Sequence, residues 1–328
     1  MASAETPVVK DLAPVGGVDD TLFLRERREL GELTTYYSWR PGASEPSAEW
    51  SLPYERQDLV EGKAGGKLVV VRYGHMAPLA DWELILKDAQ TGENCLLAEI
   101  DPDIIPFNPK TFGLPWALPT PSASGNRLVW AEWHENDDGG FSRRIMLYDV
   151  ETHELTKLGE AGDARTEGAW EPTIVGDRVA WLQKKEGREI EVIVRDLSIN
   201  TQTAYSIAGE PLKATLFDDG RRFAWDLQDG SFVYDFDTGR SLRYSNVGGN
   251  TLASGQFVSS WTAPDWIGYY DAASGEFQPI DNKGATTVDA YTFGNYFVWQ
   301  ERRPDPSDPA PDGEKREISR YFALPLGG

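Results

Sequence analysis

The stretch "GDRVAWLQ", residues 176–183, decides the fold of this chain, because the chain repeats it. A glycine and a polar or basic residue lead into a short apolar strand that carries an aromatic side chain. Related stretches begin at Gly66, Gly125, Gly220, Gly255 and Gly294, and read "GKLVVVRY", "GNRLVWAEW", "GRRFAWDL", "GQFVSSWT" and "GNYFVWQE". Self-similarity at a period of about 40 residues indicates a repeat architecture.

The aromatic position of the repeat holds tryptophan in most copies. These residues are Trp130, Trp181, Trp225 and Trp299, while Trp261 lies one place later and Val71 takes the position in the first copy. An apolar position that recurs in every unit is expected to pack between neighbouring sheets. We therefore predict that these tryptophans are core residues and not ligand contacts.

A second motif follows the aromatic strand in the first five units. An alternating strand ends at an aspartate, a turn rich in Thr, Ser, Gly and Asn comes next, and a short strand follows, as in "VIVRDLSINT". Period-two alternation around such a turn is typical of a β-hairpin. We expect the aspartates to accept hydrogen bonds from the turn backbone. They are Asp88, Asp149, Asp196, Asp235 and Asp271.

These units predict an all-β fold, a six-bladed β-propeller of four-stranded antiparallel blades. The blade cores are expected near residues 60–100, 117–160, 168–208, 212–246, 249–281 and 286–328. The last unit ends where its fourth strand should begin, so we expect an N-terminal strand to join the C-terminal blade and close the ring.

The N-terminal residues allow an alternative. If residues 18–58 make a blade of their own, the ring has seven blades. The stretch "TLFLRERRELGEL" from Thr21 favours strand over helix. We predict a flexible N-terminus over 1–17 and a single propeller domain over 18–328.

Units such as "GDRVAW…IEVIVRDLSINTQTAYSI" and "GRRFAW…SFVYDFDTGRSLRYS" resemble the TolB-like β-propeller repeat, a WD40-like repeat of the PD40 type. The resemblance covers roughly residues 60–328. It implies an extracytoplasmic, often envelope-associated protein that binds other macromolecules through one propeller face. Related propellers include peptidase-associated domains and polysaccharide lyases, and no set of catalytic residues belongs to the repeat.

The net charge of −21 comes from 53 acidic and 32 basic residues. A surface this acidic disfavours nucleic acid and anionic lipid as partners. Cys95 is the single cysteine, so the chain has no internal disulfide. No apolar run reaches the ~20 residues of a membrane helix. The opening "MASAETP" would suit a mature chain whose leader or anchor has been removed, and equally an ordinary frayed N-terminus. The extracytoplasmic location is what the TolB-like resemblance implies.

Three insertions mark the propeller face that we expect to bind. Residues 101–121 are rich in proline and carry Phe107, Phe112 and Trp116, so they form either a lip for a ligand or a plug over the channel. Residues 133–144 make an acidic hairpin. Residues 302–317 have the composition of a solvated loop.

His75 and His134 each lie nine residues after a repeat glycine, Gly66 and Gly125. Equivalent positions in adjacent blades should be neighbours at one rim. Two imidazoles with acidic residues beside them can bind a divalent metal. The prediction is no cofactor, with this speculative metal site as the alternative.

The sequence favours a non-enzymatic binding or scaffold propeller that engages a protein or other macromolecule through the face carrying loops 101–121 and 133–144. It contains no GxSxG, GxxxxGK[ST] or HExxH motif, and we assign no catalytic residue. The alternative is a carbohydrate-binding or lyase-type propeller, in which Trp116, Trp133 and Trp170 stack on sugar rings. The oligomeric state is left open.

Overall fold

The structure of the protein is a computed structural model. It describes residues 4–5, 12–26, 31–40, 43–74, 81–100, 118–135, 137, 141–161, 168–184, 190–207, 213–216, 220–227, 230–245, 250–253, 256–259, 268–271, 277–280, 286–293, 296–304 and 317–325. Every regular element within these ranges is a β-strand. The described residues include no helix long and apolar enough to cross a membrane.

Most of the chain forms antiparallel meanders of four strands. In chain order these are β2 (Leu12–Val18), β3 (Thr21–Glu26), β4 (Leu33–Trp39) and β5 (Ser47–Pro53); β6 (Arg56–Ala64), β7 (Lys67–Gly74), β8 (Trp82–Lys87) and β9 (Asn94–Glu99); β10 (Ser122–Ser124), β11 (Arg127–Glu135), β12 (Phe141–Asp149) and β13 (Glu154–Ala161); β14 (Gly168–Val175), β15 (Arg178–Lys184), β16 (Ile190–Asp196) and β17 (Thr201–Ile207); β18 (Lys213–Leu216), β19 (Arg222–Leu227), β20 (Gly230–Asp235) and β21 (Arg240–Ser245); and β22 (Asn250–Ala253), β23 (Gln256–Ser259), β24 (Gly268–Asp271) and β25 (Phe277–Pro279).

The last sheet combines the two ends of the chain. It contains β26 (Thr286–Phe293), β27 (Tyr296–Pro304) and β28 (Glu317–Pro325), and the short β1 (Ala4–Glu5) lies beside β28. The pairing is antiparallel, with Ala4 opposite Ala323 and Glu5 opposite Phe322. An N-terminal strand therefore forms the outer edge of the C-terminal sheet, as the sequence predicts.

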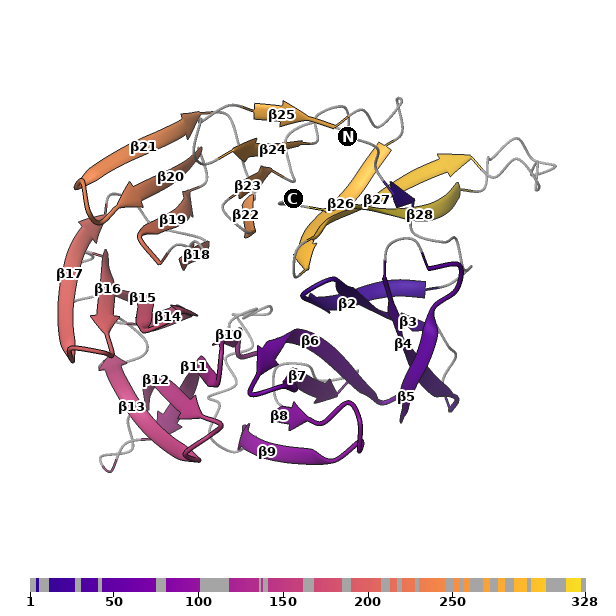
Figure 1. The fold of residues 1–328 in the computed structure, drawn as a ribbon, viewed down its shortest axis with the longest axis horizontal. Coiled ribbons are helices and arrows are strands. Elements are labelled where there is room, and N and C mark those ends of the chain that lie inside the picture. The colour runs from indigo at the N-terminus through magenta and orange to yellow at the C-terminus, as the bar shows by residue number, and fades with distance from the viewer. Residues whose placement is uncertain are drawn as a thin grey trace.

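The sheets follow one another around a common centre, and the first strand of each meander is the innermost (Figure 1). All-β composition, four-stranded antiparallel sheets and this arrangement define a β-propeller. The stretch from Thr21 is strand over residues 21–26, as predicted.

Residues 12–53 form a four-stranded meander of their own, β2 to β5, as the alternative expectation allows. Strand β2 begins at Leu12, ahead of the domain start expected at residue 18. A parallel bridge between Gly16 and Val60 links β2 to β6, so these two meanders make one eight-stranded sheet. Gly16 has φ of 151°, and a Cβ atom on it would lie 1.9 Å from the carbonyl oxygen of Val60. The close approach of the two inner strands therefore requires glycine.

The core lies between neighbouring sheets. Trp130, Trp181, Trp225 and Trp299 are at most 5% exposed, which confirms the prediction that they are core residues. Trp181, for example, packs with Ile174 and Val179 of its own sheet against Val129 and Ile145 of the preceding one. Burial of an aromatic side chain of this size stabilises the fold by several kcal/mol.

The first repeat is shifted by one residue from the register expected from sequence. The turn glycine is Gly65, whose φ of 55° matches the 60° and 58° of Gly125 and Gly176. The amide of Gly65 also donates to the carbonyl oxygen of Gly125 at 2.9 Å, which joins the two turns. Counted from Gly65, Val70 and not Val71 takes the tryptophan position.

Candidate functional site

The two ends of each sheet differ in how their strands are joined. At one end, where the structure describes the turns, a tight turn joins the first strand to the second, as at residues 65–66, 125–126 and 176–177, and a short turn joins the third to the fourth, as at residues 150–153 and 197–200. At the opposite end, a hairpin joins the second strand to the third, and a connection leads from the fourth strand to the next sheet. We call these the turn end and the hairpin end.

The turn end is capped by its own aspartates, as predicted. The Oδ1 atom of Asp88 accepts hydrogen bonds from the amides of Gln90 and Thr91, at 2.8 and 3.0 Å. The same pair of bonds recurs at Asp149, Asp196 and Asp235. The Thr91 amide, followed by that of Gln90, lowers the pKa of Asp88. For Asp271, the turn at 272–276 lies outside the described residues. The turn aspartates thus have a structural role.

The hairpin end of the β10–β13 sheet carries a charged cluster. Glu160 on β13 accepts hydrogen bonds from Lys157, Ser142 and Arg144. These hydrogen bonds, that from the Lys157 ammonium most of all, lower the pKa of Glu160 from 4.5 to about 2. Burial raises the pKa of Glu132 on β11, against the opposing effect of the Trp130 indole. The sheet therefore places one strongly acidic and one weakened carboxylic acid near its hairpin end.

Trp133 and His134 are the two proposed site residues whose side chains the structure describes, and both lie on β11 at the hairpin end. They point to opposite faces of the sheet because they are adjacent in a strand. The Arg143 guanidinium lies over the Trp133 ring, 5.8 Å from its centroid. His134 pairs with Ser142 across the hairpin. Both side chains are half-buried.

The remaining proposed site residues are not brought together by anything that the structure describes. Phe107, Phe112, Trp116 and His75 lie outside the described residues. The backbone of Trp170 lies on β14, opposite Leu182, and its side chain is outside the described part. Whether these residues contact a ligand therefore stays a prediction.

The pairing of His75 with His134 rested on the register of the first repeat. Counted from Gly65, the counterpart of His134 is Gly74 and not His75. His75 itself lies outside the described residues, so a metal site that includes it stays a prediction. Among the described residues, no group of three His, Cys, Asp or Glu side chains lies close enough to hold a metal ion.

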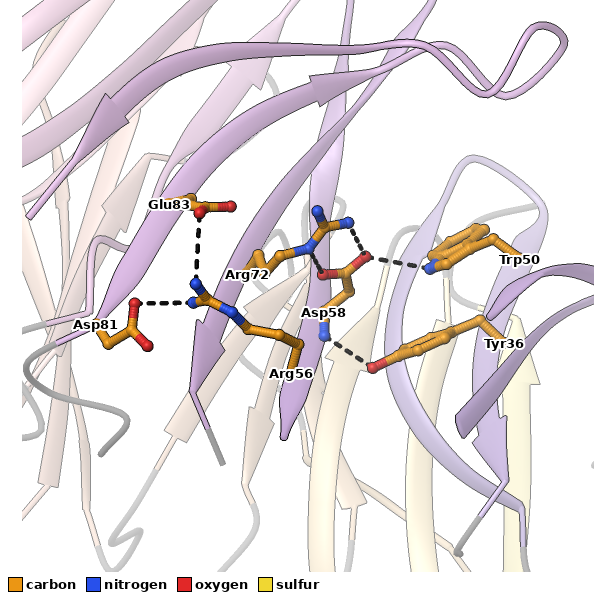
Figure 2. A network of polar contacts seen from close by, with 7 residues as sticks. All are labelled: Tyr36, Trp50, Arg56, Asp58, Arg72, Asp81 and Glu83. Carbon is orange, nitrogen blue, oxygen red and sulfur yellow. Dashed lines mark hydrogen bonds and ion pairs between the residues drawn. The ribbon is translucent and has the colours of Figure 1, made fainter. Parts of the chain in front are cut away.

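A buried polar network joins the first two meanders, and sequence reasoning missed it (Figure 2). Asp58 on β6 is 0% exposed. Its carboxylate accepts two bonds from the Arg72 guanidinium, at 2.8 and 3.1 Å, and one from the Trp50 indole at 3.1 Å. Its amide donates to the Tyr36 hydroxyl at 2.8 Å. Trp50 and Tyr36 belong to the first meander, so Asp58 and Arg72 tie the second meander to it.

Two further groups complete this junction. The Lys87 ammonium lies over the Trp50 ring, 4.9 Å from its centroid, and burial lowers the pKa of Lys87. Burial also raises the pKa of Tyr36 to about 12, so its hydroxyl stays protonated at neutral pH. Tyr36 and Trp50 are stacked with centroids 5.1 Å apart. The Arg72 guanidinium and the Trp50 indole both donate to one carboxylate that has no exposed surface, so the network holds the two meanders together.

One sequence signal could have pointed to Arg72. In three units, the residue two places after tryptophan accepts a hydrogen bond from the indole: Glu132, Gln183 and Glu301. Counted from Gly65, Arg72 stands at this position, two places after Val70, which takes the tryptophan position. A basic residue where the repeat has an acceptor indicates a separate acidic partner, and Asp58 is that partner.

No family model matches this chain, and no curated protein matches it. Solved structures do match. A prolyl endopeptidase is similar over 94% of this chain and 49% of its own, with a TM-score of 0.62 and 11% identity. The β-propeller domain of the Trilobed protease from Pyrococcus furiosus matches over 89% of this chain and 92% of its own, with a TM-score of 0.56 and 11% identity. The chain spans about half the length of that prolyl endopeptidase.

An oligogalacturonate lyase solved in complex with manganese is also similar, over 95% of this chain and 76% of its own, with a TM-score of 0.51 and 12% identity. TolB from Acinetobacter baumannii is among the similar structures at a TM-score of 0.47 and 13% identity, which is too low to carry an argument. Likeness at such identities shows the fold alone. The chain is a β-propeller, a class whose members have unrelated functions.

Proposed function

We propose that this protein is a non-enzymatic binding propeller that holds a macromolecular partner, a protein or a glycan, at its hairpin end. One observation carries the proposal, which is the difference between the two ends of the sheets. The turn end uses its polar groups to cap its own turns. The hairpin end receives the long connection between β9 and β10, residues 100–121, and the β27–β28 hairpin, residues 305–316. Variable connections on a rigid scaffold are where propellers bind.

The form of the ring is part of this proposal. We propose seven blades, because five four-stranded sheets accompany the eight-stranded sheet of two meanders. Closure is supported by the β1–β28 pairing and by an apolar cluster between the first meander and the last sheet. That cluster contains Leu22, Leu24, Trp39, Tyr296, Val298 and Ala323. A closed ring would hold the hairpin-end connections at fixed positions.

The TolB-like affiliation and the extracytoplasmic location rest on the repeat residues. The units around "GDRVAW" and "GRRFAW" carry the resemblance, and TolB-like propellers bind macromolecules outside the cytoplasm. Fractionation of cells that express the full natural protein tests the location. Recovery in the cytoplasmic fraction would contradict it.

A carbohydrate-binding or lyase-type propeller is the second candidate. Trp133 with Arg143 stacked over it places an aromatic ring and a guanidinium together at the hairpin end. That pair suits an acidic sugar, because the ring packs on the sugar face and the guanidinium binds a carboxylate. Similarity to an oligogalacturonate lyase structure supports the fold of this candidate. Binding or eliminative cleavage of oligogalacturonates in a direct assay would favour it over the first.

Site-specific crosslinking tests the binding-propeller proposal. A photo-crosslinking residue is placed at Trp133, at the hairpin end, and at Glu151, an exposed residue of the turn end, in separate variants. We expect a defined adduct in native-host cells from position 133 and not from position 151. Replacing residues 104–114 by a short Gly-Ser linker should remove the adduct and leave the melting temperature unchanged. Equal adducts from both positions would overturn the proposal. A large loss of stability in the linker variant would indicate that residues 101–121 pack as a plug over the channel.

A further inference from the structure

Within the part of the chain that the structure describes, each sheet ends in an outer strand with an unpaired edge, and one of these strands differs from the rest. Strand β17, "TQTAYSI", contains no charged residue and no proline. The other outer strands all contain one or both. They are β5 with Glu49 and Pro53, β9 with Glu99, β13 with Glu154, Lys157 and Glu160, β21 with Arg240 and Arg243, β25 with Pro279 and β1 with Glu5.

Charges and prolines on outer strands block pairing with a further strand. Strand β17 lacks both over seven residues, although the chain has a net charge of −21. Its inner edge is fully paired with β16, from Thr201 opposite Asp196 to Ile207 opposite Ile190. Its outer edge has no partner strand among the described residues. Five of its residues are exposed, so the edge is open to solvent.

The edge is also held in place. Tyr205 on β17 packs on the next sheet, with its ring centroid 5.3 Å from that of Tyr234 and 4.9 Å from that of Phe236. A strand fixed on both its inner edge and one face loses little further freedom when another strand pairs with it. Ile199, in the turn that leads into β17, is 68% exposed and offers an apolar contact at one end of the edge.

We propose that the free edge of β17 binds an extended, positively charged peptide segment of a partner protein by β-strand addition. Main-chain hydrogen bonds along the edge supply the affinity. The acidic protein attracts cationic segments over long range, and a neutral edge lets the backbones approach without repulsion between side chains. This surface lies on the outer rim, so the inference goes beyond the proposed hairpin-end function and does not depend on it.

The probe is a fluorescein-labelled peptide of alternating Lys and Val residues, with an alternating Glu and Val peptide as its charge-reversed counterpart. Binding is measured by fluorescence anisotropy, and pairing by hydrogen exchange of residues 201–207. We expect the Lys peptide to bind and to slow exchange in β17, and the Glu peptide to do neither. Exchange elsewhere in the chain should not change.

Two substitutions at one exposed position separate strand addition from general attraction. Thr203→Lys should weaken the affinity for the Lys peptide by about fivefold, because like charges on paired strands repel. Thr203→Glu should bind it at least as tightly as the unmodified protein. Leu155→Lys is the matched control, because it changes the net charge equally on β13, where Leu155 is 52% exposed. It should bind like the unmodified protein.

Three results would each overturn the inference. Leu155→Lys could weaken binding as much as Thr203→Lys, which would indicate attraction to the whole surface. The Lys peptide could bind without slowing exchange in residues 201–207. Sedimentation could also show self-association that both Thr203 substitutions remove, which would make the occupant of the β17 edge a second copy of this chain.

Discussion

Replacing Asp58 by alanine tests the role of the buried network most directly. The change removes a carboxylate with no exposed surface and leaves its partners in place. The Arg72 guanidinium would lose two hydrogen bonds, of 2.8 and 3.1 Å, and the Trp50 indole would lose one of 3.1 Å. The Arg72 side chain is 14% exposed, so water replaces these contacts poorly.

The expected cost follows from that geometry. Breaking a buried ion pair from one side costs about 3–5 kcal/mol, because the remaining charge stays buried without a partner. We therefore expect Asp58→Ala to lower the free energy of unfolding by about 4 kcal/mol. At about 2 °C per kcal/mol for a large domain, the melting temperature should fall by about 8 °C. The double variant Asp58→Ala/Arg72→Met should cost less than Asp58→Ala, since it leaves no unpaired charge.

Urea denaturation followed by tryptophan fluorescence measures these differences. Asp81→Ala is the control, because the ion pair between Arg56 and Asp81 is as short, at 2.8 Å, but has side chains 33% and 51% exposed. It should cost at most about 1 kcal/mol. The reasoning is refuted if Asp58→Ala costs no more than Asp81→Ala, or if the double variant is less stable than Asp58→Ala.

Three further predictions concern the ring and its charges. Gly16→Ala should destabilise the protein by at least about 2 kcal/mol in urea, because its Cβ would meet the carbonyl oxygen of Val60, whereas Gly66→Ala, with no atom within 4 Å, should cost about 1 kcal/mol. Trp181→Ala should cost about 3–5 kcal/mol in the same assay, and a cost below 1 kcal/mol would contradict its place in the core. Glu160 has a folded pKa of about 2, below 4.5, so its contribution is present above pH 4.5 and lost as the pH falls towards 2. The difference in stability between the unmodified protein and Glu160→Gln should shrink over that interval, and a constant difference would count against the ion pairs.

Local features of the sequence predicted most of the sheets. A glycine turn, an aromatic strand and an aspartate turn each act over a few residues, so they can be recognised without knowing what packs against them. The buried Trp181 and the self-capped Asp88 turn both follow from such signals. The join between β1 and β28 was also predictable, because the last unit lacks a fourth strand.

The first meander was harder to recognise because it lacks those signals. Asp19, with φ of 49°, stands at the turn where later units have glycine, and Leu24 stands where they have tryptophan. The turn residue keeps the positive φ of the later units, while the residue types differ. The one-residue error in the first repeat has a similar cause, since Gly65 and Gly66 both have positive φ and the sequence does not distinguish them.

The alternation within strands and the residues of the turns are local features of the sequence. They were enough to predict the all-β repeat and its aromatic core. The Asp58 network and the open edge of β17 could not be read in that way. The members of the Asp58 network come from four strands of two meanders, β4, β5, β6 and β7, and β17 is an edge only because of its place in the sheet order. The Asp58 network depends on contacts between residues distant in sequence and on burial of the carboxylate, and the β17 edge depends on which strands pair, so only the folded arrangement shows them.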